Sequence, residues 1–551
     1  MTDCNILFQL LERNADLYGD ETALIEINPI HDDAKNLAWQ EYNLVETGHD
    51  RHYRKEMTWK EFDERANRFA NLLTGRGVKK GDKVAILLMN CIDWLPIYFG
   101  ALKTGALAVP LNFRYTAEEI GYCLGLSDAE TLIFGPEFLD RVGEVKDELT
   151  GIKRFIFVGM DIPDYAESFE GMIEDFPAER PKGREDAIAE TDDAAIYFSS
   201  GTTGFPKAIL HTHSSLFSSA VTEHAHHGQR RDDVFLLIPP LYHTGAKMHW
   251  FGSLYSGSKA VLLKGAEPRW VLETASNEGV SIVWLLVPWA QDILDAIDSG
   301  AIDAGKLDLH RWRIMHIGAQ PVPSSLIKRW KEHFPGHQYD TNYGLSESIG
   351  PGCVHLGLEN IHKVGAIGKA GAGWRTRIVG EDGNDVKQGD VGELIVKGPG
   401  LMKEYYHDPE ATAAALRDGW LYTGDMAMSD EDGFIFLVDR KKDVIITGGE
   451  NIYPVQVEDF LRQNDKIKDV AVIGIADKRM GEIAVAVIEL KNGATASEAE
   501  INKFAGGLPR YKRPRKIIFD TVPRNPTGKI EKPKLRKKYN ADSIVAKVTE
   551  I

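Results

Sequence analysis

The sequence predicts an α/β protein with a large N-terminal body of helix-covered, mainly parallel sheets, a small β subdomain and a small α+β C-terminal domain. Three observations carry this prediction. Short apolar strands alternate with helix-like stretches through most of the chain, which is typical of a parallel sheet covered by helices. Beyond Val386, short β-type runs are separated by Gly and Asp, which indicates antiparallel pairing. A charged run at 439–442 then precedes a segment with another order of helices and strands.

The elements of the large body are predicted from the periodicity of apolar residues. Residues 58–73 are predicted to form an amphipathic helix, because Thr58 and Glu61 have the spacing of a capping box and apolar residues follow one stripe. The later predicted elements are a helix at 94–102 and strands at 84–88, 106–111, 194–198, 233–238, 281–287 and 314–317. The polar segment 28–55 is expected to be a surface excursion. Residues 1–438 are therefore interpreted as one large domain.

The C-terminal part of the chain is predicted to contain two further units. The β subdomain has its clearest strands at 392–396 and 433–438. Beyond it, the predicted elements are helices at 454–462 and 497–504 and strands at 470–475, 483–490 and 516–519. We expect the charged run Asp439-Arg-Lys-Lys442 to be a hinge (439–442) and residues 443–551 to form the small domain.

The composition excludes several classes of protein. The chain has 551 residues, of which 43% are hydrophobic and 27% charged, so neither disorder nor a fibrous repeat is expected. A formal net charge of -17 argues against a nucleic-acid coat protein, and we expect no nucleic-acid partner. The net charge does not argue against a small anionic ligand, because local fields decide such binding.

The cysteines and the apolar segments indicate where the protein resides. The four cysteines are scattered without a Cys-x-x-Cys pair, which fits neither a disulfide framework nor a structural zinc site and favours a reducing compartment. The first residues do not resemble a secretory signal. No apolar run approaches the roughly 20 residues needed to span a bilayer. We therefore expect a soluble, cytoplasmic protein without a transmembrane segment, whose oligomeric state stays open and includes a possible homodimer.

The most informative stretch is the loop Tyr197-Phe-Ser-Ser-Gly-Thr-Thr-Gly-Phe-Pro-Lys207, in which an apolar strand breaks into hydroxyls and glycines and closes on a lysine. Backbone N–H groups, hydroxyls and the lysine charge can together hold phosphate oxygens. The alternative is a flexible surface turn. Neither a Walker A loop nor a Gly-x-Gly-x-x-Gly fingerprint occurs in the sequence. The loop therefore indicates a phosphate cradle of another kind.

The loop and later motifs resemble those of the adenylate-forming superfamily, which comprises acyl- and aryl-CoA synthetases, luciferases and peptide-synthetase adenylation domains. The matching segments, in the order of the family, are Ser199-Ser-Gly-Thr-Thr-Gly-Phe-Pro-Lys207, Pro239-Pro-Leu-Tyr-His243, Gly318-Ala-Gln-Pro321, Tyr343-Gly-Leu-Ser-Glu347, Tyr422-Thr-Gly-Asp425, Asp439-Arg-Lys-Lys-Asp443, Gly448-Gly-Glu-Asn-Ile-Tyr-Pro454 and Pro526-Thr-Gly-Lys529. One such motif would be weak, but their order along almost the whole chain makes chance implausible.

The resemblance implies a set of residues for ATP binding and adenylation. The implied catalytic residues are Lys529, Glu347, Lys207 and His243, with Glu347 as the Mg²⁺ ligand. The implied ATP- and AMP-binding residues are Ser199, Ser200, Gly201, Thr202, Thr203, Gly204, Gly318, Ala319, Gln320, Asn342, Tyr343, Gly344, Ser346, Asp425 and Arg440. Among these, Asp425 and Arg440 would bind the ribose and Tyr343 would stack on adenine. Mg²⁺ is the implied cofactor, and ATP and coenzyme A are the implied co-substrates.

The resemblance also implies a mobile small domain that serves the second half-reaction. The chain would pivot at Lys442, which would withdraw Lys529 and bring Gly448 and Gly449 to line a tunnel for the pantetheine arm of CoA. A tight turn is the structural alternative for the two glycines. Lys529 stands apart from the other lysines of its basic run because it follows Pro526-Thr-Gly.

The acyl pocket is the least defined site in the sequence. By position in the motifs it draws on His243, Lys247, Met248, Trp250, Gly318 and Ile349. Some long-chain enzymes have a gating tryptophan where this chain has Lys247, which favours a medium-chain or an alicyclic or aromatic acid over a long-chain fatty acid. A lysine stem can also lie along an acyl chain. The group His224, His226 and His227 invites a metal site, but no second ligand set has recognisable spacing, so we expect these histidines to be solvated.

The sequence therefore predicts an AMP-forming acid–CoA ligase that first makes an acyl-adenylate and pyrophosphate and then acyl-CoA and AMP. An adenylation enzyme that loads a carrier protein is the main alternative, although the chain has no carrier domain after its small domain. A non-catalytic nucleotide sensor would require the loss of a reactive residue, but all of the implied reactive residues are present. A luciferase-type oxygenase is compatible with the fold, but no feature of the sequence asks for it.

Overall fold

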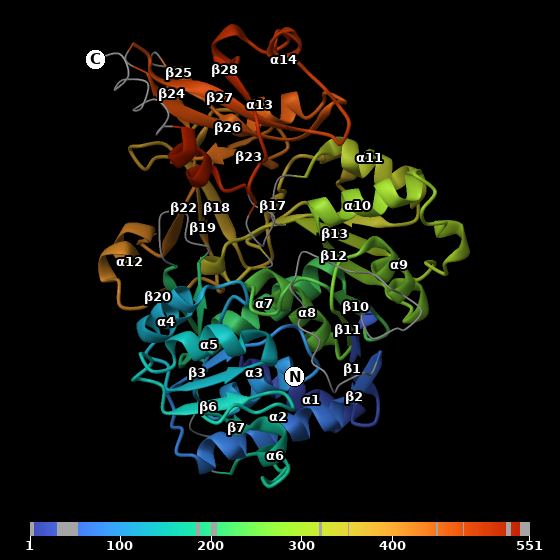
Figure 1. Ribbon diagram of the computed structural model, residues 1–551, viewed down its shortest axis with the longest axis vertical. Coiled ribbons are helices and arrows are strands. Elements are labelled where there is room, and N and C mark those ends of the chain that lie inside the picture. Colours follow the sequence, from blue (N-terminus) through green and yellow to red (C-terminus); the bar gives the residue numbers. More distant parts are fainter. Residues whose placement is uncertain are drawn as a thin grey trace.

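The computed structural model confirms the predicted fold class, a mixed α/β body followed by a small domain (Figure 1). It describes residues 5–29, 53–182, 188–199, 206–318, 322–350, 352–447, 450–477, 479–524 and 530–539. The N-terminal half, blue to green, fills the lower part of Figure 1, and the orange-to-red C-terminal segment lies at the opposite end. Most of the predicted excursion 28–55 lies outside the described residues.

The first large sheet has seven strands and is mainly parallel, as the sequence predicts. Its strands, in spatial order, are β14 (Gln338–Asp340), β13 (Ile314–Gly318), β12 (Ile282–Leu286), β10 (Val234–Leu237), β11 (Lys259–Leu263), β1 (Thr22–Ile27) and β2 (Arg54–Thr58). Only β1 with β2 pairs antiparallel. The register of β13 with β14 places His316 beside Asp340.

The second large sheet has eight strands and holds the glycine-rich loop at a hairpin. Its strands, in spatial order, are β20 (Glu404–Tyr405), β9 (Ala208–Thr212), β8 (Asp193–Phe198), β4 (Leu107–Pro110), β3 (Lys83–Leu87), β5 (Thr131–Phe134), β6 (Arg154–Phe157) and β7 (Glu167–Ser168). The pairs of β9 with β8 and with β20 are antiparallel, whereas the other pairs are parallel. The loop therefore connects two neighbouring antiparallel strands.

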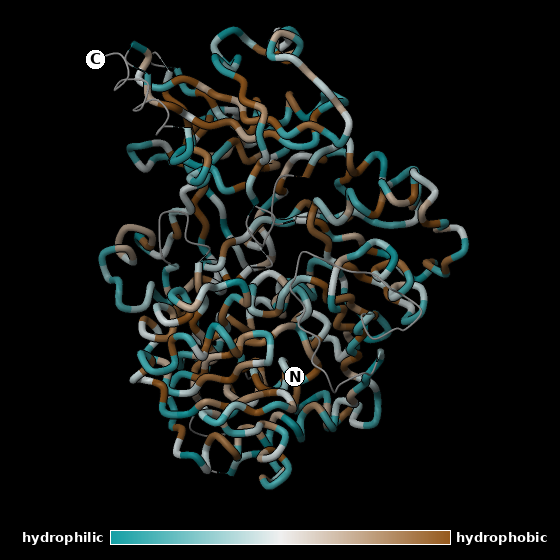
Figure 2. The backbone as a smooth tube through the Cα atoms, in the orientation of Figure 1, coloured by the Kyte–Doolittle hydropathy of each residue, from teal (hydrophilic) through white to brown (hydrophobic). Residues whose placement is uncertain are grey.

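Helices cover both large sheets and pack between them (Figure 1). They are α1 (Leu7–Tyr18), α2 (Trp59–Gly75), α3 (Trp94–Lys103), α4 (Ala117–Leu126), α5 (Leu139–Val145), α6 (Phe169–Ile173), α7 (His213–His227), α8 (Thr244–Ser256), α9 (Pro268–Asn277), α10 (Val287–Asp298) and α11 (Ser324–His333). The predicted capping box of α2 is present, with Thr58 accepting from the Glu61 backbone and Glu61 accepting from the Thr58 backbone. Strands and inner helix faces are the most hydrophobic parts of the chain (Figure 2).

The β subdomain is antiparallel throughout, as the runs beyond Val386 predict. Its strands are β18 (Arg375–Val379), β19 (Gly392–Lys397), β21 (Leu416–Arg417), β22 (Trp420–Ser429) and β23 (Ile435–Arg440), joined by α12 (Pro409–Ala415). A separate small sheet consists of β15 (Asn342–Tyr343), β16 (Val354–His355) and β17 (Lys369–Ala370). These strands carry several of the predicted nucleotide-binding residues.

The small C-terminal unit has the predicted order of helices and strands and an apolar core of its own. Its elements are β24 (Ile445–Thr447), β25 (Glu450–Ile452), α13 (Pro454–Leu461), β26 (Ile467–Asp477), β27 (Gly481–Leu490), α14 (Glu498–Ala505) and β28 (Lys516–Phe519). The sequence does not predict the hairpin of β24 and β25, which precedes α13 in the structure. The Val455 backbone N–H donates to Asp439 Oδ2 over 2.9 Å, so the start of α13 contacts the segment that precedes the unit.

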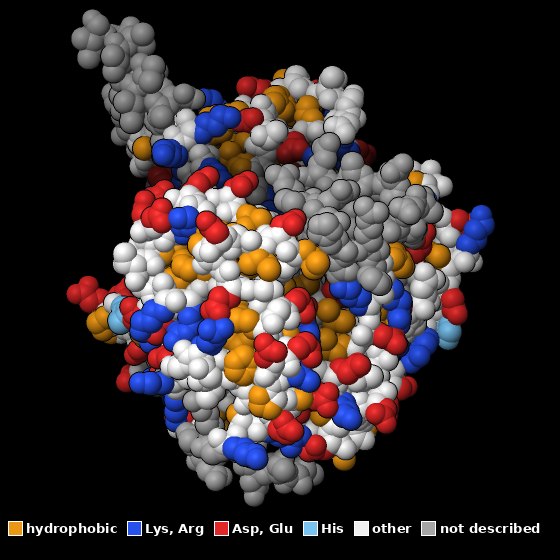
Figure 3. All heavy atoms as spheres, turned by 60° about the horizontal axis from the view of Figure 1, so that its bottom comes forward, with side chains coloured by type: hydrophobic (Ala, Val, Ile, Leu, Met, Phe, Trp, Pro, Cys, Tyr) orange, Lys and Arg blue, Asp and Glu red, His pale blue; other side chains and the backbone are white. Residues whose placement is uncertain are grey.

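The surface mixes charges of both signs. In Figure 3, Lys and Arg lie among Asp and Glu across the face in view, so the net charge of -17 is not gathered into one acidic patch there. Within the described ranges, no helix is both long enough and apolar enough to cross a membrane.

Candidate active site

The glycine-rich loop is closed at its base by two hydrogen bonds between Ser199 and Lys207. The Ser199 N–H donates to the Lys207 carbonyl over 3.0 Å, and the Lys207 N–H donates to Ser199 Oγ over 3.0 Å. These bonds hold the end of β8 against the start of β9. The predicted phosphate-binding residues Ser200, Gly201, Thr202, Thr203 and Gly204 lie outside the described residues.

Tyr405 joins two of the predicted catalytic residues. Its hydroxyl donates to Glu347 Oε1 over 2.8 Å, and the Lys207 ammonium lies 4.7 Å from the centre of its ring. Burial and the neighbouring Glu347 charge raise the pKa of Tyr405, so the phenol keeps its proton and acts as a donor. The Met402 N–H donates to the Glu347 carbonyl over 2.7 Å, which fixes the backbone as well. Tyr405 is not among the predicted site residues, because no spacing in the sequence links it to Glu347.

A second group joins Tyr343, Asp425 and Arg440. Arg440 Nε lies 2.6 Å from Asp425 Oδ1, and the Tyr343 hydroxyl donates to Asp425 Oδ2 over 2.5 Å. Asp425 and Arg440 are register partners on β22 and β23, so the antiparallel pairing itself brings them together. Burial and the Asp425 charge raise the pKa of Tyr343, and the ring stays neutral.

Ser346 directly precedes Glu347 in the chain and is contacted by two side chains. His211 Nε2 lies 2.8 Å from the Ser346 carbonyl, and Thr244 Oγ1 lies 3.5 Å from Ser346 Oγ. Burial lowers the pKa of His211 to about 4, so the ring is neutral and donates through Nε2. Ser346 and Glu347 belong to one short 3₁₀ turn, Ser346–Ser348. The structure therefore brings most of the described ATP-binding residues of the prediction together.

Close packing requires glycine at position 344 but not at position 318. A Cβ on Gly344 would lie 2.8 Å from the Gly352 Cα, so close backbone packing requires glycine there. A Cβ on Gly318 would lie 3.6 Å from both Asn342 Oδ1 and Trp284 Nε1, which are ordinary contact distances. Packing of the described residues therefore does not require glycine at 318, and the bare backbone leaves room there. Ala319 and Gln320, which follow it, lie outside the described residues.

The predicted acyl-pocket residues lie on and around α8. His243 caps this helix, with its Nδ1 accepting from the Gly245 N–H over 3.1 Å. Met248 is buried, and its sulfur lies 3.3 Å from Ser219 Oγ. Trp250 is buried and contacts Phe62 of α2.

The remaining two pocket residues have unusual surroundings. Lys247 is fully buried, and its ammonium lies 4.3 Å from the centre of the Tyr197 ring and 5.4 Å from that of Tyr98. Burial lowers its pKa well below the ordinary value of a lysine. Ile349 is buried in a left-handed conformation with φ of 54°, a strained position for a β-branched residue.

The prediction that His226 and His227 are solvated is wrong. His227 is buried, and Nε2 of both rings lies within 3.0 Å of Asp340 Oδ2. A polar helix stretch normally indicates a solvated face, but here the carboxylates Asp340 and Glu223 compensate the imidazoles inside the protein. His224 is half-buried and lies 3.3 Å from Ser256 Oγ. Asp340 lies more than 100 residues from both histidines in the chain, so no local spacing indicates that contact.

The predicted hinge 439–442 begins with the last two residues of β23, Asp439 and Arg440, and continues past the end of the strand. Lys441 Nζ lies 3.0 Å from Glu393 Oε2, and burial lowers the pKa of Lys442. The predicted tunnel residues Gly448 and Gly449 and the predicted catalytic Lys529 lie outside the described residues.

Comparison with known proteins places the chain in one family. Residues 11–406 match the AMP-binding enzyme family, and residues 456–529 match the AMP-binding enzyme C-terminal domain. The chain is 34% identical to the long-chain-fatty-acid–CoA ligase FadD13 of Mycobacterium tuberculosis over 88% of its length and 93% of that protein. It is 33% identical to a feruloyl-CoA synthase of an Amycolatopsis species, over 89% and 95% of the two chains.

A solved structure of a CoA ligase has a similar fold. The structure of the anthranilate–CoA ligase AuaEII in complex with anthranoyl-AMP is similar with a TM-score of 0.84, 26% identity and coverage of 98% of both chains. The family matches cover the body and the small unit, and the curated relatives match over nearly their full length. The chain therefore belongs to the AMP-binding enzyme family, the adenylate-forming superfamily, as an AMP-forming acid–CoA ligase.

Proposed function

We propose that this ligase binds Mg–ATP between the glycine-rich loop and the group formed by Tyr343, Asp425 and Arg440. The observation that carries this proposal is the shared contact of Lys207 and Glu347 with Tyr405, which places a cation and a carboxylate beside the base of the loop. Asp425, held by its two partners, offers a fixed acceptor for the ribose hydroxyls. The phosphates would then extend from the ribose toward Lys207 and Glu347.

The first half-reaction joins two anions. A carboxylate oxygen of the acid attacks the α-phosphorus of ATP, the bond to pyrophosphate breaks, and an acyl-adenylate forms. Repulsion between the two anions is the main barrier, and fixed cations lower it. We assign this role to Lys207 and Lys529. The Glu347 carboxylate is a hard oxygen ligand of the kind that Mg²⁺ prefers, and the ion would neutralise phosphate charge.

The second half-reaction needs a different arrangement of the chain. The CoA thiol attacks the acyl carbonyl, the thiol proton is lost, the bond to AMP breaks, and acyl-CoA forms. We propose that residues 1–438 and 443–551 are two domains that rotate about 439–442 with Lys442 as the pivot. The separate core of the small unit supports this division. Gly448 and Gly449 would line the pantetheine tunnel after the rotation.

We propose an alicyclic or aromatic acid with a hydrogen-bond acceptor on its ring as the substrate class. The indole N–H of Trp284 is buried, has no hydrogen-bond partner among the described residues, and lies beside Gly318 of the proposed pocket. A buried unpaired donor disfavours a purely aliphatic substrate, because such a chain would leave the N–H unsatisfied. The relatives named for feruloyl-CoA and anthranilate–CoA formation support the same class, whereas FadD13 is named for long-chain fatty acids.

The test is the exchange of labelled pyrophosphate into ATP, measured without CoA, across a panel of acids. The panel pairs ring acids with and without a ring hydroxyl or carbonyl and includes medium- and long-chain fatty acids. We expect the fastest exchange with an oxygenated ring acid and a smaller preference for it in Trp284→Phe. Faster exchange with a long-chain fatty acid would overturn the proposed class but not the reaction.

A further inference from the structure

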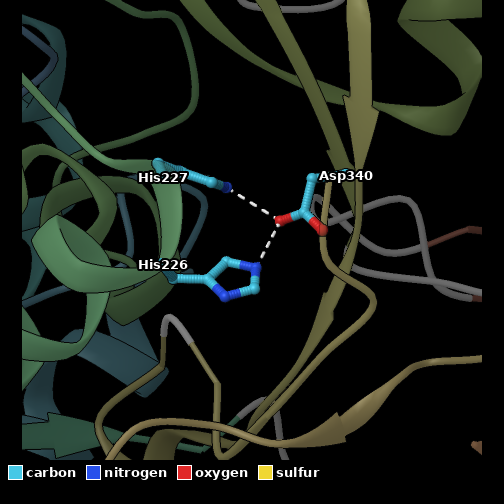
Figure 4. A group of neighbouring side chains, drawn as sticks. All are labelled: His226, His227 and Asp340. Atoms are coloured by element: carbon cyan, nitrogen blue, oxygen red, sulfur yellow. Dashed lines mark hydrogen bonds and ion pairs between the residues drawn. The ribbon is translucent and has the colours of Figure 1, made fainter. Parts of the chain in front are cut away.

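A buried group of imidazoles and carboxylates lies outside the residues assigned to catalysis. His226 and His227, at the C-terminal end of α7, both point at Asp340 at the end of β14 (Figure 4). Asp340 Oδ2 lies 3.0 Å from His226 Nε2 and 2.8 Å from His227 Nε2. One ligand atom from each residue lies within 4.8 Å of the other two. Three atoms of metal-ligating type thus converge from two elements.

A carboxylate lies against the other ring nitrogen of His227. His227 Nδ1 lies 2.6 Å from Glu223 Oε1, one helical turn earlier on α7. Metal-ligating histidines characteristically donate their other ring N–H to such a carboxylate. In the tautomer that carries its proton on Nδ1, His227 presents a lone pair from Nε2 to Asp340. Two electron-rich atoms 2.8 Å apart repel each other unless a proton or a metal ion lies between them.

The charges of the group point to a cation as well. The side chains of Glu223 and Asp340 are fully inaccessible to solvent. In the described part of the chain, both carboxylates form ion pairs with histidines alone. A buried charge is strongly unfavourable unless it is paired, so the two carboxylates need positive charge beside them, from the imidazoles or from a bound cation. One divalent ion neutralises both carboxylates.

We propose that His226 Nε2, His227 Nε2 and Asp340 Oδ2 bind a first-row divalent metal ion, with Zn²⁺ as the best match. Imidazole nitrogen with carboxylate oxygen suits zinc and its neighbours rather than Mg²⁺ or Ca²⁺. Ligands at about 2.0 to 2.1 Å from a tetrahedral zinc lie about 3.3 Å apart. The two observed separations are a few tenths of an ångström shorter. Side-chain rotations that lengthen these two separations and bring the two imidazole nitrogens, which lie within 4.8 Å of each other, to a similar distance would open the site to the ion.

The proposed ion would position the nucleotide-binding segment. It would tie the end of α7 to Asp340, which precedes Asn342 and Tyr343 by two and three residues. His316 on β13 borders the group, with Nδ1 3.3 Å from Asp340 Oδ2 and Nε2 3.2 Å from Asn342 Oδ1. This consequence rests on the proposed role of Tyr343 in ATP binding, whereas the metal site itself does not.

The experiment measures zinc in untagged, full-length protein that has been stripped with a chelator and then exposed to excess zinc and desalted. We expect about one zinc ion per chain for the wild type and less than about a tenth of that for His226→Ala. His226 is the better target because it is half-buried, so its truncation disturbs the core less than that of His227. His224→Ala, on the same helix outside the group, should retain the ion. Wild-type protein that retains no zinc would overturn the proposal, as would equal binding by His226→Ala.

A second measurement applies even if His226→Ala does not fold. X-ray absorption at the zinc edge of the wild type should show a nitrogen and oxygen shell with the multiple-scattering pattern of two imidazoles. A shell without imidazole would overturn the site. Neither experiment depends on turnover, so the proposed metal site and the proposed function can fail independently.

Discussion

Arg440 and Asp425 face each other across the hairpin of β22 and β23, with Arg440 Nε 2.6 Å from Asp425 Oδ1. The Tyr343 hydroxyl contacts the other oxygen of the same carboxylate. Both oxygens are therefore fixed before any ligand arrives. A rigid acceptor of this kind suits the neighbouring hydroxyls of a ribose, because little ordering is required on binding.

Replacement of Asp425 with Asn tests this role. The amide keeps the size of the side chain but removes the charge, and a hydrogen bond to a charged acceptor contributes about 1.5 to 3 kcal/mol. The KM for ATP should rise about tenfold or more. The matched control is Asp385→Asn, which removes an exposed partner of Arg377 in the same subdomain. Equal KM values for wild type and Asp425→Asn would contradict the assignment.

Replacement of Glu347 with Gln should impair the use of Mg²⁺. The amide still accepts a hydrogen bond from Tyr405 but is a weaker ligand for a hard cation. Adenylation, followed by pyrophosphate release, should slow by about a hundredfold, and half-maximal activity should need more Mg²⁺. Glu359→Gln, an exposed site on a nearby loop, should behave as wild type. An unchanged Mg²⁺ dependence in Glu347→Gln would exclude its role as the ligand.

Replacement of Lys529 with Ala should separate the two half-reactions. Loss of a cation that opposes anionic repulsion should slow adenylate formation by about a hundredfold or more. Formation of acyl-CoA from presynthesised acyl-adenylate should be nearly unchanged, because the lysine is withdrawn at that stage in the proposed mechanism. Lys534→Ala, which removes an exposed lysine paired with Glu531, is the control. If both half-reactions fall equally, Lys529 has another role.

The buried Lys247 should make stability depend on pH. Its pKa is lowered in the folded protein by burial, so between that pKa and the unfolded value of about 10.4 the unfolded chain binds more protons. The stability of the wild type should therefore rise with pH through this window. Lys247→Met removes an unsatisfied buried donor and should be about 1 kcal/mol more stable at pH 7.

The measurement for Lys247 is urea unfolding of both proteins at pH 7 and pH 9. The stability advantage of Lys247→Met should shrink at the higher pH. Protonation of Lys247 then stabilises the unfolded wild-type chain less, so the free energy of unfolding of the wild type is larger. Lys328→Met, at an exposed position of α11, should show no such change. A gap that widens with pH would contradict the lowered pKa.

Much of the fold could be predicted because its local signals are strong. The capping box at Thr58 and Glu61, the alternation of strands with helices and the change of texture beyond Val386 all have counterparts in the structure. The pairing of Asp425 with Arg440 also agrees with the motif positions, since antiparallel register brings the two motifs together. These features depend on spacing along the chain or on motifs that lie on paired strands.

The histidine group and Tyr405 could not be predicted for a related reason. His227 meets Asp340 across 113 positions, and Tyr405 meets Glu347 across 58. Their contacts depend on how the end of α7 meets the end of β14 and on how β20 joins the edge of the second sheet. The polar residues 224–227 indicate a helix face exposed to solvent. In the structure, buried carboxylates compensate the imidazoles instead.

The most direct test of the central claim is the formation of AMP with purified protein, Mg–ATP and a responsive acid, with and without CoA. The proposed reaction predicts that AMP and an acyl-CoA, identified by mass spectrometry, form in equal amounts only when CoA is present. Pyrophosphate release with no acyl-CoA in the presence of CoA would contradict it and would indicate another acceptor for the acyl group.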